Sequence, residues 1–257
     1  MIANYHTHTH RCNHAIGREE DYVREALKMG LKTLGWADHT PYLFPDGYYS
    51  SYRMRPAQLP GYVRTIEDLR EQYRGQIEMP IGLETEYYPK HFGSLLDFLR
   101  DFPIDYLILG QHFVGNEYDA PYCAVATDEK ELLRRYCRQS MEAMNTGLFT
   151  YFAHPELIHY QGEWKFYQET MRPMCAEAKA CGIPLEINLL GLGDGRHYPN
   201  RFFLEVAAEE GCEMILGCDA HSPQALNRPE VEAKALALAK EFDLKVLETV
   251  SLRSIHK

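Results

Sequence analysis

The sequence has no C-x-x-C motif and no hydrophobic run that approaches the length of a membrane span. Its seven cysteines are an odd number, and most of them fall inside predicted helices or strands. A free cysteine in such a place behaves as a small hydrophobic residue, so the pattern indicates a reducing compartment rather than a disulfide framework. No signal-peptide pattern follows Met1. We therefore expect a cytoplasmic protein without a membrane anchor.

The sequence also has fewer basic than acidic residues. The 257 residues include 27 Lys and Arg against 37 Asp and Glu, which gives a formal net charge of −10. An acidic chain repels nucleic-acid backbones and anionic lipid headgroups, and no basic track emerges from the sequence. We expect neither nucleic acid nor a membrane as a partner. A small anionic substrate is compatible with this charge, because a metal ion or one arginine reverses the local field.

Short apolar runs alternate with longer amphipathic stretches along the chain. The apolar runs predict strands at 2–8, 33–38, 79–87, 106–113, 150–154, 184–190 and 214–219, with a further strand at 244–249. The amphipathic stretches predict helices at 19–29, 59–73, 94–102, 128–146, 166–180, 202–210 and 229–242. Repeated strand–helix units indicate a parallel sheet. Their number, without a break in composition, favours one α/β barrel over residues 1–257, with an open doubly wound sheet as the alternative.

Histidines gather at the predicted strand ends. The stretch NYHTHTHRCNHA, residues 4–15, holds four of the twelve, and His6 and His8 lie on one face because they are two apart on a strand. Later strand ends carry further histidines and acids, namely His39, Glu84, Glu86, His112, His154, Asp219 and His221. In an α/β barrel these ends converge on one face. Imidazole and carboxylate ligands suit zinc, manganese or iron, so the sequence predicts a metal site there.

The remaining histidines do not share this placement, and for them we expect no metal-binding role. They are His10, His91, His159, His197 and His256. The longest irregular stretch, residues 40–60, is rich in Tyr, Pro and Ser and is too long for a plain connection. We expect it to be a lid or a substrate loop.

Several motifs in order resemble those of the polymerase-and-histidinol-phosphatase (PHP) superfamily: HTHTHRCNHA, ADHTPY, GLETEYY, DYLILGQHF, AHPELI, LEINLLGL and GCDAHSP. The stretch RMRPAQLPGYVRTIEDLREQYRGQIEMPIGLE resembles the monofunctional histidinol-phosphate phosphatase branch. The resemblance implies a distorted (β/α)7 barrel with three clustered divalent ions (Zn, Mn or Fe) at the carboxyl ends of its strands. It also implies an enzyme of histidine biosynthesis that hydrolyses L-histidinol phosphate.

The resemblance further implies a ligand set for each ion. The first ion would be held by His6, His8, Glu84 and Asp219. Glu84 would bridge to a second ion held by His112 and His154, and the third would be held by His14, His39 and His221. Strand alternation alone does not choose between Glu84 and Glu86, but the G-L-E motif places the bridge at Glu84. Glu86 is then an acid behind the ligands or on the surface.

Clustered divalent ions lower the pKa of a bound water and hold a phosphoryl group. We therefore predict in-line attack on phosphorus by a hydroxide between the first two ions. Asp219 and His221 are candidates for protonating the leaving alcohol, and a metal-bound water is an equal alternative. For the phosphate, the guanidinium of Arg196 is the first candidate. Asn188 is a further candidate for substrate binding, although it and Glu186 share a strand face and either could instead lie behind the ligands. Arg53 and Arg55 in the long loop could close over the substrate, but we expect them to be exposed charges.

The sequence departs from the branch at positions that would contact the substrate. No Lys or Arg follows His154 until Lys165, the loop after the sixth strand reads GDGRH where the branch is more basic, and Asn4 stands where relatives often carry Asp. Phosphatase chemistry is therefore better indicated than the substrate. The alternatives are a PHP phosphoesterase that acts on another small phosphomonoester or on phosphotyrosine, and a metal-stabilised module without catalysis.

Overall fold

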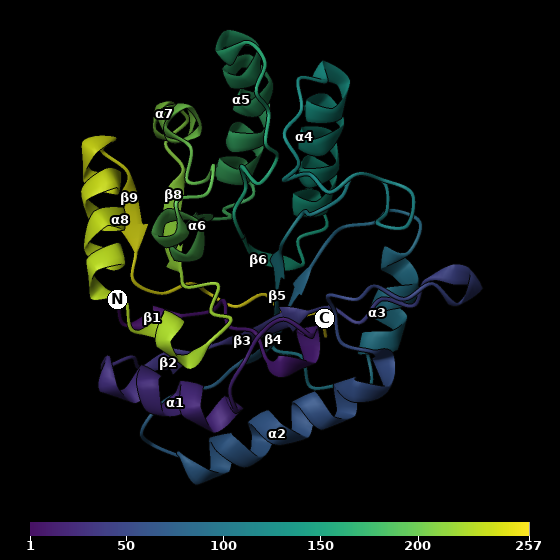
Figure 1. Ribbon diagram of the computed structural model, residues 1–257, viewed down its shortest axis with the longest axis vertical. Coiled ribbons are helices and arrows are strands. Elements are labelled where there is room, and N and C mark those ends of the chain that lie inside the picture. Colours follow the sequence, from purple (N-terminus) through teal and green to yellow (C-terminus); the bar gives the residue numbers. More distant parts are fainter. Residues whose placement is uncertain (257) are drawn as a thin grey trace.

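Figure 1 shows the computed structural model, which describes residues 1–256. The strands of this part of the chain are β1 Ala3–Asn4, β2 Thr33–Leu34, β3 Trp36–His39, β4 Ile81–Thr85, β5 Tyr106–Leu109, β6 Phe149–Phe152, β7 Leu185–Asn188, β8 Glu213–Gly217 and β9 Lys245–Leu247. The α-helices are α1 Glu19–Lys28, α2 Leu59–Gln72, α3 Phe92–Leu99, α4 Lys130–Asn145, α5 Trp164–Ala180, α6 Leu189–Asp194, α7 Arg201–Glu209 and α8 Pro229–Glu241.

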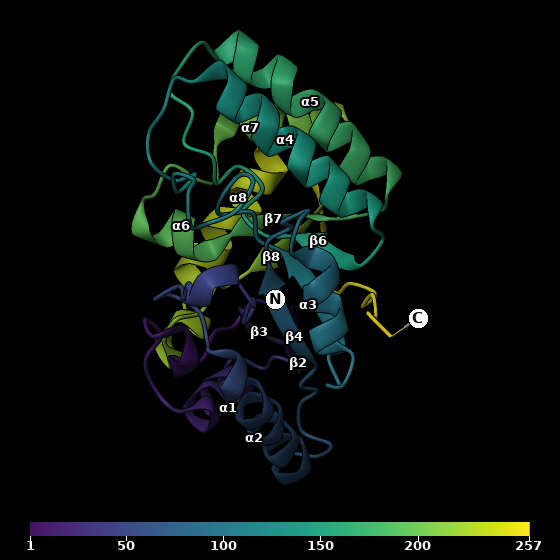
Figure 2. The same ribbon diagram turned by 90° about the vertical axis from the view of Figure 1, so that its right-hand side faces the viewer.

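Strands β3 to β9 form one sheet in sequence order, and every pairing in it is parallel. Neighbours in the sheet are neighbours in the sequence, which is the arrangement that repeated strand–helix units produce. The helices lie outside the strands: α4 and α5 pack together at one end of the molecule, and α1 and α2 lie at the other (Figures 1 and 2). The predicted α/β fold class is confirmed.

The segment predicted as a strand at 2–8 is largely irregular, so that prediction is wrong in its extent. Only Ala3–Asn4 pairs as a strand, with β2, while Thr7 makes an isolated bridge to Ala220 after β8. On its other side the Thr7 carbonyl accepts a hydrogen bond of 2.8 Å from the Ala37 amide in β3. The segment thus lies between β3 and the end of β8. It occupies the place of the first strand of a distorted barrel.

The inside of this ring is filled with side chains. Alternate residues of the strands point inward and form a small cluster separate from the larger core between sheet and helices. At its centre the Tyr106 hydroxyl donates to the carbonyls of Tyr5 and Trp36, at 2.8 and 3.0 Å. A Cβ at Gly35 or Gly82 would overlap the Tyr106 ring or hydroxyl. Because the interior is packed, the open site lies at the strand ends.

The predicted strand at 184–190 ends earlier and turns directly into α6. Asn188, the last residue of β7, accepts a hydrogen bond of 2.8 Å from the Gly191 amide through its Oδ1 and so caps the helix. This cap stabilises the start of a helix at the point where the strand was predicted to continue, so residues 189 and 190 are helical. The amide oxygen of Asn188 is thereby committed to the start of α6.

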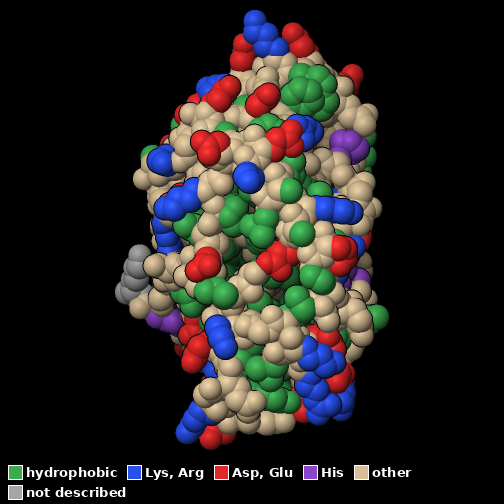
Figure 3. All heavy atoms as spheres, turned by 90° about the vertical axis from the view of Figure 1, so that its left-hand side faces the viewer, with side chains coloured by type: hydrophobic (Ala, Val, Ile, Leu, Met, Phe, Trp, Pro, Cys, Tyr) green, Lys and Arg blue, Asp and Glu red, His purple; other side chains and the backbone are tan. Residues whose placement is uncertain are grey.

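The outer surface mixes both signs of charge. On the face shown in Figure 3, Lys and Arg side chains lie among Asp, Glu and hydrophobic side chains, and the described residues form no continuous basic track there. Within residues 1–256 no helix is both long enough and apolar enough to cross a bilayer.

Candidate metal centre

The nine predicted ligands come together where the strands end. His39 is the last residue of β3, and Glu84 lies near the end of β4. The others lie on the loops that follow later strands or on the N-terminal segment, namely His6, His8, His14, His112, His154, Asp219 and His221. Most of them are nearly inaccessible to solvent, and His14 and His221 are the more exposed members. A cavity of about 440 Å³ opens onto the group.

The Glu84 carboxylate stands at the centre of this group. It is 1% exposed, and both of its oxygens face imidazole rings. The nearest nitrogens to Oε1 are those of His154 at 2.8 Å and His112 at 3.5 Å, and the nearest to Oε2 are those of His39 at 3.0 Å, His8 at 3.5 Å and His6 at 3.6 Å. Such a carboxylate is placed to bridge two cations.

Glycine at position 110 makes room for this carboxylate. A Cβ there would overlap Glu84 Oε1 and would lie 2.6 Å from both Cδ and Cγ of the same side chain. Gly110 follows β5, the strand next to the one that carries Glu84. The close approach of the two strand ends therefore requires a residue without a side chain.

Several ligand-type atoms in the group are buried without a hydrogen-bond partner in residues 1–256. They are His6 Nε2, His8 Nδ1 and Nε2, His39 Nδ1, His154 Nδ1 and Glu84 Oε2. A buried polar atom left without a partner costs about 1–3 kcal/mol, and most such atoms in folded proteins are satisfied. A concentration of them in one place indicates a missing partner. Divalent cations fit this donor set of imidazoles and carboxylates.

Hydrogen bonds at Nδ1 set the orientation of four of the rings. The acceptors are Glu186 Oε1 for His6, Glu86 Oε1 for His112, the Cys12 carbonyl for His14 and the Asp219 carbonyl for His221, at 2.8, 2.8, 2.8 and 3.0 Å. An acceptor at Nδ1 keeps the proton on that nitrogen and leaves the Nε2 lone pair free for a metal. Ring orientation is therefore consistent with metal binding through Nε2.

The ligand atoms form compact groups. Those of His6, His8 and Asp219 lie within 4.8 Å of one another, as do those of His14, His39 and His221. The first group is part of the first set that the resemblance implied, and the second group is the whole third set. The Nε2 atoms of His14 and His221 are only 2.9 Å apart. The two rings are thus aimed at one point.

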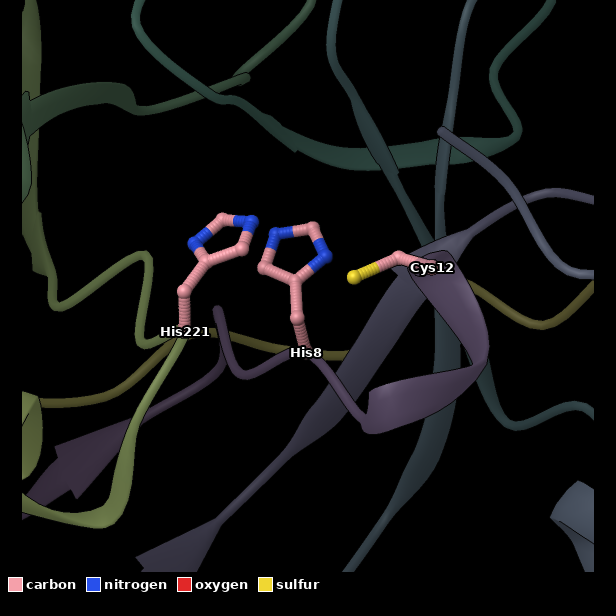
Figure 4. A group of neighbouring side chains, drawn as sticks. All are labelled: His8, Cys12 and His221. Carbon is pink, nitrogen blue, oxygen red and sulfur yellow. The ribbon is translucent and has the colours of Figure 1, made fainter. Parts of the chain in front are cut away.

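Cys12 lies beside this cluster. In Figure 4 the His8 ring lies between the His221 ring and the Cys12 sulfur, and the two imidazoles stack with centroids 4.0 Å apart. The thiol accepts a hydrogen bond of 3.3 Å from the Ala15 amide, and burial raises the pKa of Cys12 well above its ordinary value. The thiol is therefore neutral in the absence of metal, and its sulfur lies within 4.8 Å of ligand atoms of His8 and His221.

The electrostatics keep the carboxylates ionised. Burial opposes the ionisation of Glu84, but the neighbouring His112, His39 and His6 outweigh it and hold the pKa of Glu84 well below its usual range. The pKa of Asp219 is lowered in the same way, against burial, by neighbouring histidines of which His6 has the largest effect. Both acids are therefore present as anions near neutral pH.

The imidazoles divide into two groups. Burial disfavours the charged form of His8, but Asp219 and Asp38 outweigh burial and raise the pKa of His8 to about 9. Burial lowers the pKa of His39 to about 4, and it also lowers the pKa of His221 well below the ordinary value. Without metal, His8 therefore holds a proton near neutral pH, whereas His39 and His221 are neutral.

Arg196 and Asn188, the two predicted substrate contacts, have different environments. Arg196 lines the cavity, its side chain is 43% exposed, and its Nη1 donates to the Tyr198 hydroxyl at 2.8 Å. Asn188 is 1% exposed and does not line the cavity; its Nδ2 donates to Asp219 Oδ2 at 3.2 Å and to Glu186 Oε2 at 2.8 Å. The structure places Asn188 behind Asp219.

The structure also settles the surroundings of Arg53, Glu86 and Asn4. Arg53, predicted to be an exposed charge, is 1% exposed, so that prediction is wrong. Glu86, left open between the surface and a place behind the ligands, is fully buried, and Arg53 and His112 lower its pKa to about 2 against the effect of burial. Asn4 makes no hydrogen bond to a histidine ring; its Oδ1 accepts from the Cys218 amide at 2.8 Å and ties the N-terminal segment to the end of β8.

Sequence reasoning missed Asp38. This residue is fully buried, accepts hydrogen bonds from the amide and hydroxyl of Thr9, and has its Oδ1 3.6 Å from His8 Nδ1. It therefore holds the loop that carries His8. The available signal was an acid inside the strand GWADH, because a charged residue buried in a strand requires a partner.

His10 lies apart from the group. Its ring is 57% exposed, and its nearest charged neighbour is Glu19 at 3.5 Å. The structure therefore separates this histidine from the three others of the same stretch.

The family model of the PHP domain matches residues 4–189. A probable histidinol-phosphatase of Deinococcus radiodurans is 28% identical over 232 residues, which cover 86% of this chain and 87% of the relative. A histidinol-phosphatase of Bacillus subtilis is 27% identical over 252 residues, which cover 84% of this chain and 92% of the relative.

A solved structure is similar over nearly its whole length. It is the crystal structure of the histidinol phosphate phosphatase of Lactococcus lactis complexed with zinc, L-histidinol and phosphate. The TM-score is 0.75 at 21% sequence identity, and the match covers 97% of this chain and 96% of that one. At this level of identity the likeness shows a common fold.

Proposed function

The chain belongs to the PHP domain family, and we propose that it is a metal-dependent phosphomonoesterase that hydrolyses L-histidinol phosphate to L-histidinol and phosphate. One observation carries the chemistry: the buried Glu84 carboxylate is surrounded by imidazoles whose ligand atoms lack other partners. The names of the relatives support the substrate. The reaction would serve histidine biosynthesis.

The ligand sets of this proposal follow the groups described above. His6, His8, Glu84 and Asp219 would hold one divalent ion, Glu84, His112 and His154 a second, and His14, His39 and His221 a third. Zinc, manganese and iron all suit such ligands. When bound, the ions supply an activated water and offset the charge that builds on the phosphoryl oxygens.

The chain's own side chains would bind and orient the substrate. Arg196 reaches the cavity wall, and its hydrogen bond to Tyr198 holds the guanidinium on that side of the opening. A guanidinium grips phosphate oxygens in a bidentate fork. Asn188 holds Asp219 from behind through the Asp219 Oδ2 atom. We assign Arg196 to phosphate binding and Asn188 to the orientation of Asp219.

The source of the proton for the leaving alcohol is a separate question. His221 Nδ1 lies 3.3 Å from Asp219 Oδ1, and both residues line the cavity. The pKa values of both are lowered well below their ordinary values, so neither holds a spare proton in the metal-free cluster near neutral pH. That this pair donates the proton stays a prediction. Near-normal turnover of Asp219→Asn at full metal loading would contradict it.

A substrate panel combined with metal analysis tests the proposed function. We expect kcat/KM for L-histidinol phosphate to exceed that for p-nitrophenyl phosphate and phosphotyrosine by at least about 100-fold. Each specific contact with the substrate that stabilises the transition state by about 1.4 kcal/mol raises kcat/KM roughly tenfold, so two such contacts are enough. A value no better than that for the aryl phosphates would exclude the proposed substrate. A fully metal-loaded protein without phosphatase activity would indicate a non-catalytic module.

Arg196→Met provides a narrower test. Removal of the charged hydrogen bonds to phosphate is expected to lower kcat/KM by about 10–100-fold, since such bonds contribute roughly 1.5–3 kcal/mol. Metal content should not change, because none of the hydrogen-bond or ion-pair partners of the Arg196 side chain is a proposed metal ligand. Unchanged kinetics would remove Arg196 from the proposal.

A further inference from the structure

Arg53 is a fully buried charge in the long segment 40–60. Its guanidinium is 1% exposed, and it lies between two carboxylates. Nη1 and Nη2 donate to Glu86 at 3.1 and 2.9 Å in a bidentate pair, and Nε and Nη2 donate to Glu117. Nη1 also donates to the Thr40 carbonyl at 2.8 Å. A charge this deeply buried is costly unless its partners are fully engaged, as they are here.

The Arg53–Glu86 pair continues to a predicted metal ligand. Glu86 Oε1 accepts from Arg53 Nη2 and lies 2.8 Å from His112 Nδ1. The other nitrogen of the same ring, Nε2, faces Glu84 Oε1 at 3.5 Å. A continuous line of contacts therefore runs from Arg53 through Glu86 and His112 to the central carboxylate.

The same guanidinium also reaches the strand end that carries His39. Thr40, whose carbonyl accepts from Arg53, directly follows His39, and its hydroxyl donates to the Glu84 carbonyl at 3.0 Å. Arg53 thus joins the ends of β3 and β4 just below the cluster. Glu117, by contrast, contacts Arg53, Tyr52 and Tyr88 and no histidine of the cluster.

We propose that Arg53 and Glu86 are positioning residues of the metal centre, which hold His112 with its Nε2 directed at Glu84. The segment 40–60 then helps to fix the orientation of the His112 ring through Arg53. This inference rests on the metal centre of the proposed function. Neither residue touches substrate or metal; each acts through His112.

A purely structural role for Arg53, as an anchor of the segment, predicts a different pattern. Anchoring depends on Glu117 as much as on Glu86, because both carboxylates accept from the same guanidinium. Of the two carboxylates, only Glu86 forms a hydrogen bond with the His112 ring. Glu117→Gln is therefore the matched control, since it weakens the anchor and leaves the ligand contact in place.

The test measures metal retention in the full-length protein with three variants, Glu86→Gln, Arg53→Lys and Glu117→Gln. Zinc-loaded samples are titrated with a competing chelator. We expect Glu86→Gln and Arg53→Lys to weaken retention of one ion by about 10–100-fold, the usual effect of removing a partner behind a ligand. Lysine keeps the charge but lacks the bidentate fork. Glu117→Gln should stay within about threefold of the wild type.

A second readout reports on the ring itself. In the zinc-loaded wild type labelled with ¹⁵N-histidine, the His112 Nδ1 should carry a slowly exchanging proton, identified by its loss in His112→Asn. This signal should shift in Glu86→Gln and not in Glu117→Gln. An unprotonated Nδ1 in the wild type would overturn the inference even if a variant failed to fold. Equal retention in all folded variants would also overturn it.

The two proposals fail in different ways. A wild-type protein that binds no divalent ions would refute the metal centre, and with it the proposed function. A wild-type protein that binds the ions, with variants that retain them equally well, would refute only the positioning role of Arg53 and Glu86.

Discussion

Glu84 Oε1 lies 2.8 Å from His154 Nε2, while Oε2 of the same carboxylate is buried and has no hydrogen-bond partner in residues 1–256. One oxygen faces the strand ends of β5 and β6, and the other faces the N-terminal segment and β3. A single carboxylate thus connects both halves of the cluster. The predictions below depend on this arrangement.

The first prediction contrasts two histidines of one stretch. His8→Gln should lower metal content and reduce kcat/KM by at least about 100-fold. Loss of one ligand weakens binding of the ion, and with it the contacts between that ion and the phosphate. His10→Gln should match the wild type, since its ring is 57% exposed and lies outside the cluster. Metal analysis and steady-state kinetics decide between the two. Equal effects of both substitutions would contradict the site.

The second prediction concerns Gly110. In Gly110→Ala the new Cβ would overlap Glu84 Oε1, so the carboxylate has to move away from its histidines. We expect at least about a 100-fold loss of kcat/KM with a preserved far-UV spectrum, measured at saturating metal.

Gly93 provides the matched control for Gly110. A Cβ at Gly93 in α3 meets no atom within 4 Å in the described part of the chain. Gly93→Ala should therefore keep full activity. Normal activity of Gly110→Ala would show that the Glu84 position is not critical.

The third prediction is that metal loading releases protons. His8 has a pKa of about 9 in the metal-free cluster, so it is protonated at pH 7, whereas a ligating imidazole is neutral. Apparent affinity should therefore fall as pH falls below 9, by about tenfold per pH unit for each proton displaced. Calorimetry in two buffers of different ionisation enthalpy measures the released protons. Absence of release at pH 7 would contradict the assignment.

The fourth prediction concerns Glu156, a buried acid two residues after His154. It is 2% exposed, its Oε1 accepts from the Asn200 amide at 3.1 Å, and burial raises its pKa from 4.5 to about 8. The folded state therefore keeps the proton at a pH where the unfolded state has lost it. This contribution to stability is complete below pH 4.5 and is lost as pH rises through about 8, at about 1.4 kcal/mol per pH unit between these values.

Glu156→Gln is neutral at every pH and should remove this dependence. Denaturant unfolding of the variant and the wild type, at equal metal loading, should show a difference in free energy of unfolding that changes between pH 5 and pH 8 in favour of the variant. A difference that stays constant with pH would mean that Glu156 is ionised in the folded protein.

Local patterns in the sequence predicted most of the helices and strands. The predicted helices all occur, with bounds such as Glu19–Lys28 for the stretch 19–29 and Pro229–Glu241 for 229–242. Helix periodicity is a local property that one chain displays by itself. The course of the N-terminal segment was harder to predict, because it depends on simultaneous contacts with β3 and with Ala220. Periodicity contains no information about such long-range closure.

Residue types at the strand ends indicated the metal centre, because parallel strands bring their carboxyl ends to one face. What the sequence by itself determined was therefore the α/β class and the side chains that meet at the rim. Only the tertiary structure decided which atoms face one another. It separated Glu84 from Glu86, buried Arg53 between Glu86 and Glu117, and placed Asn188 behind Asp219. Those pairings join residues far apart in the chain, and they exist only once the strands have assembled into the sheet.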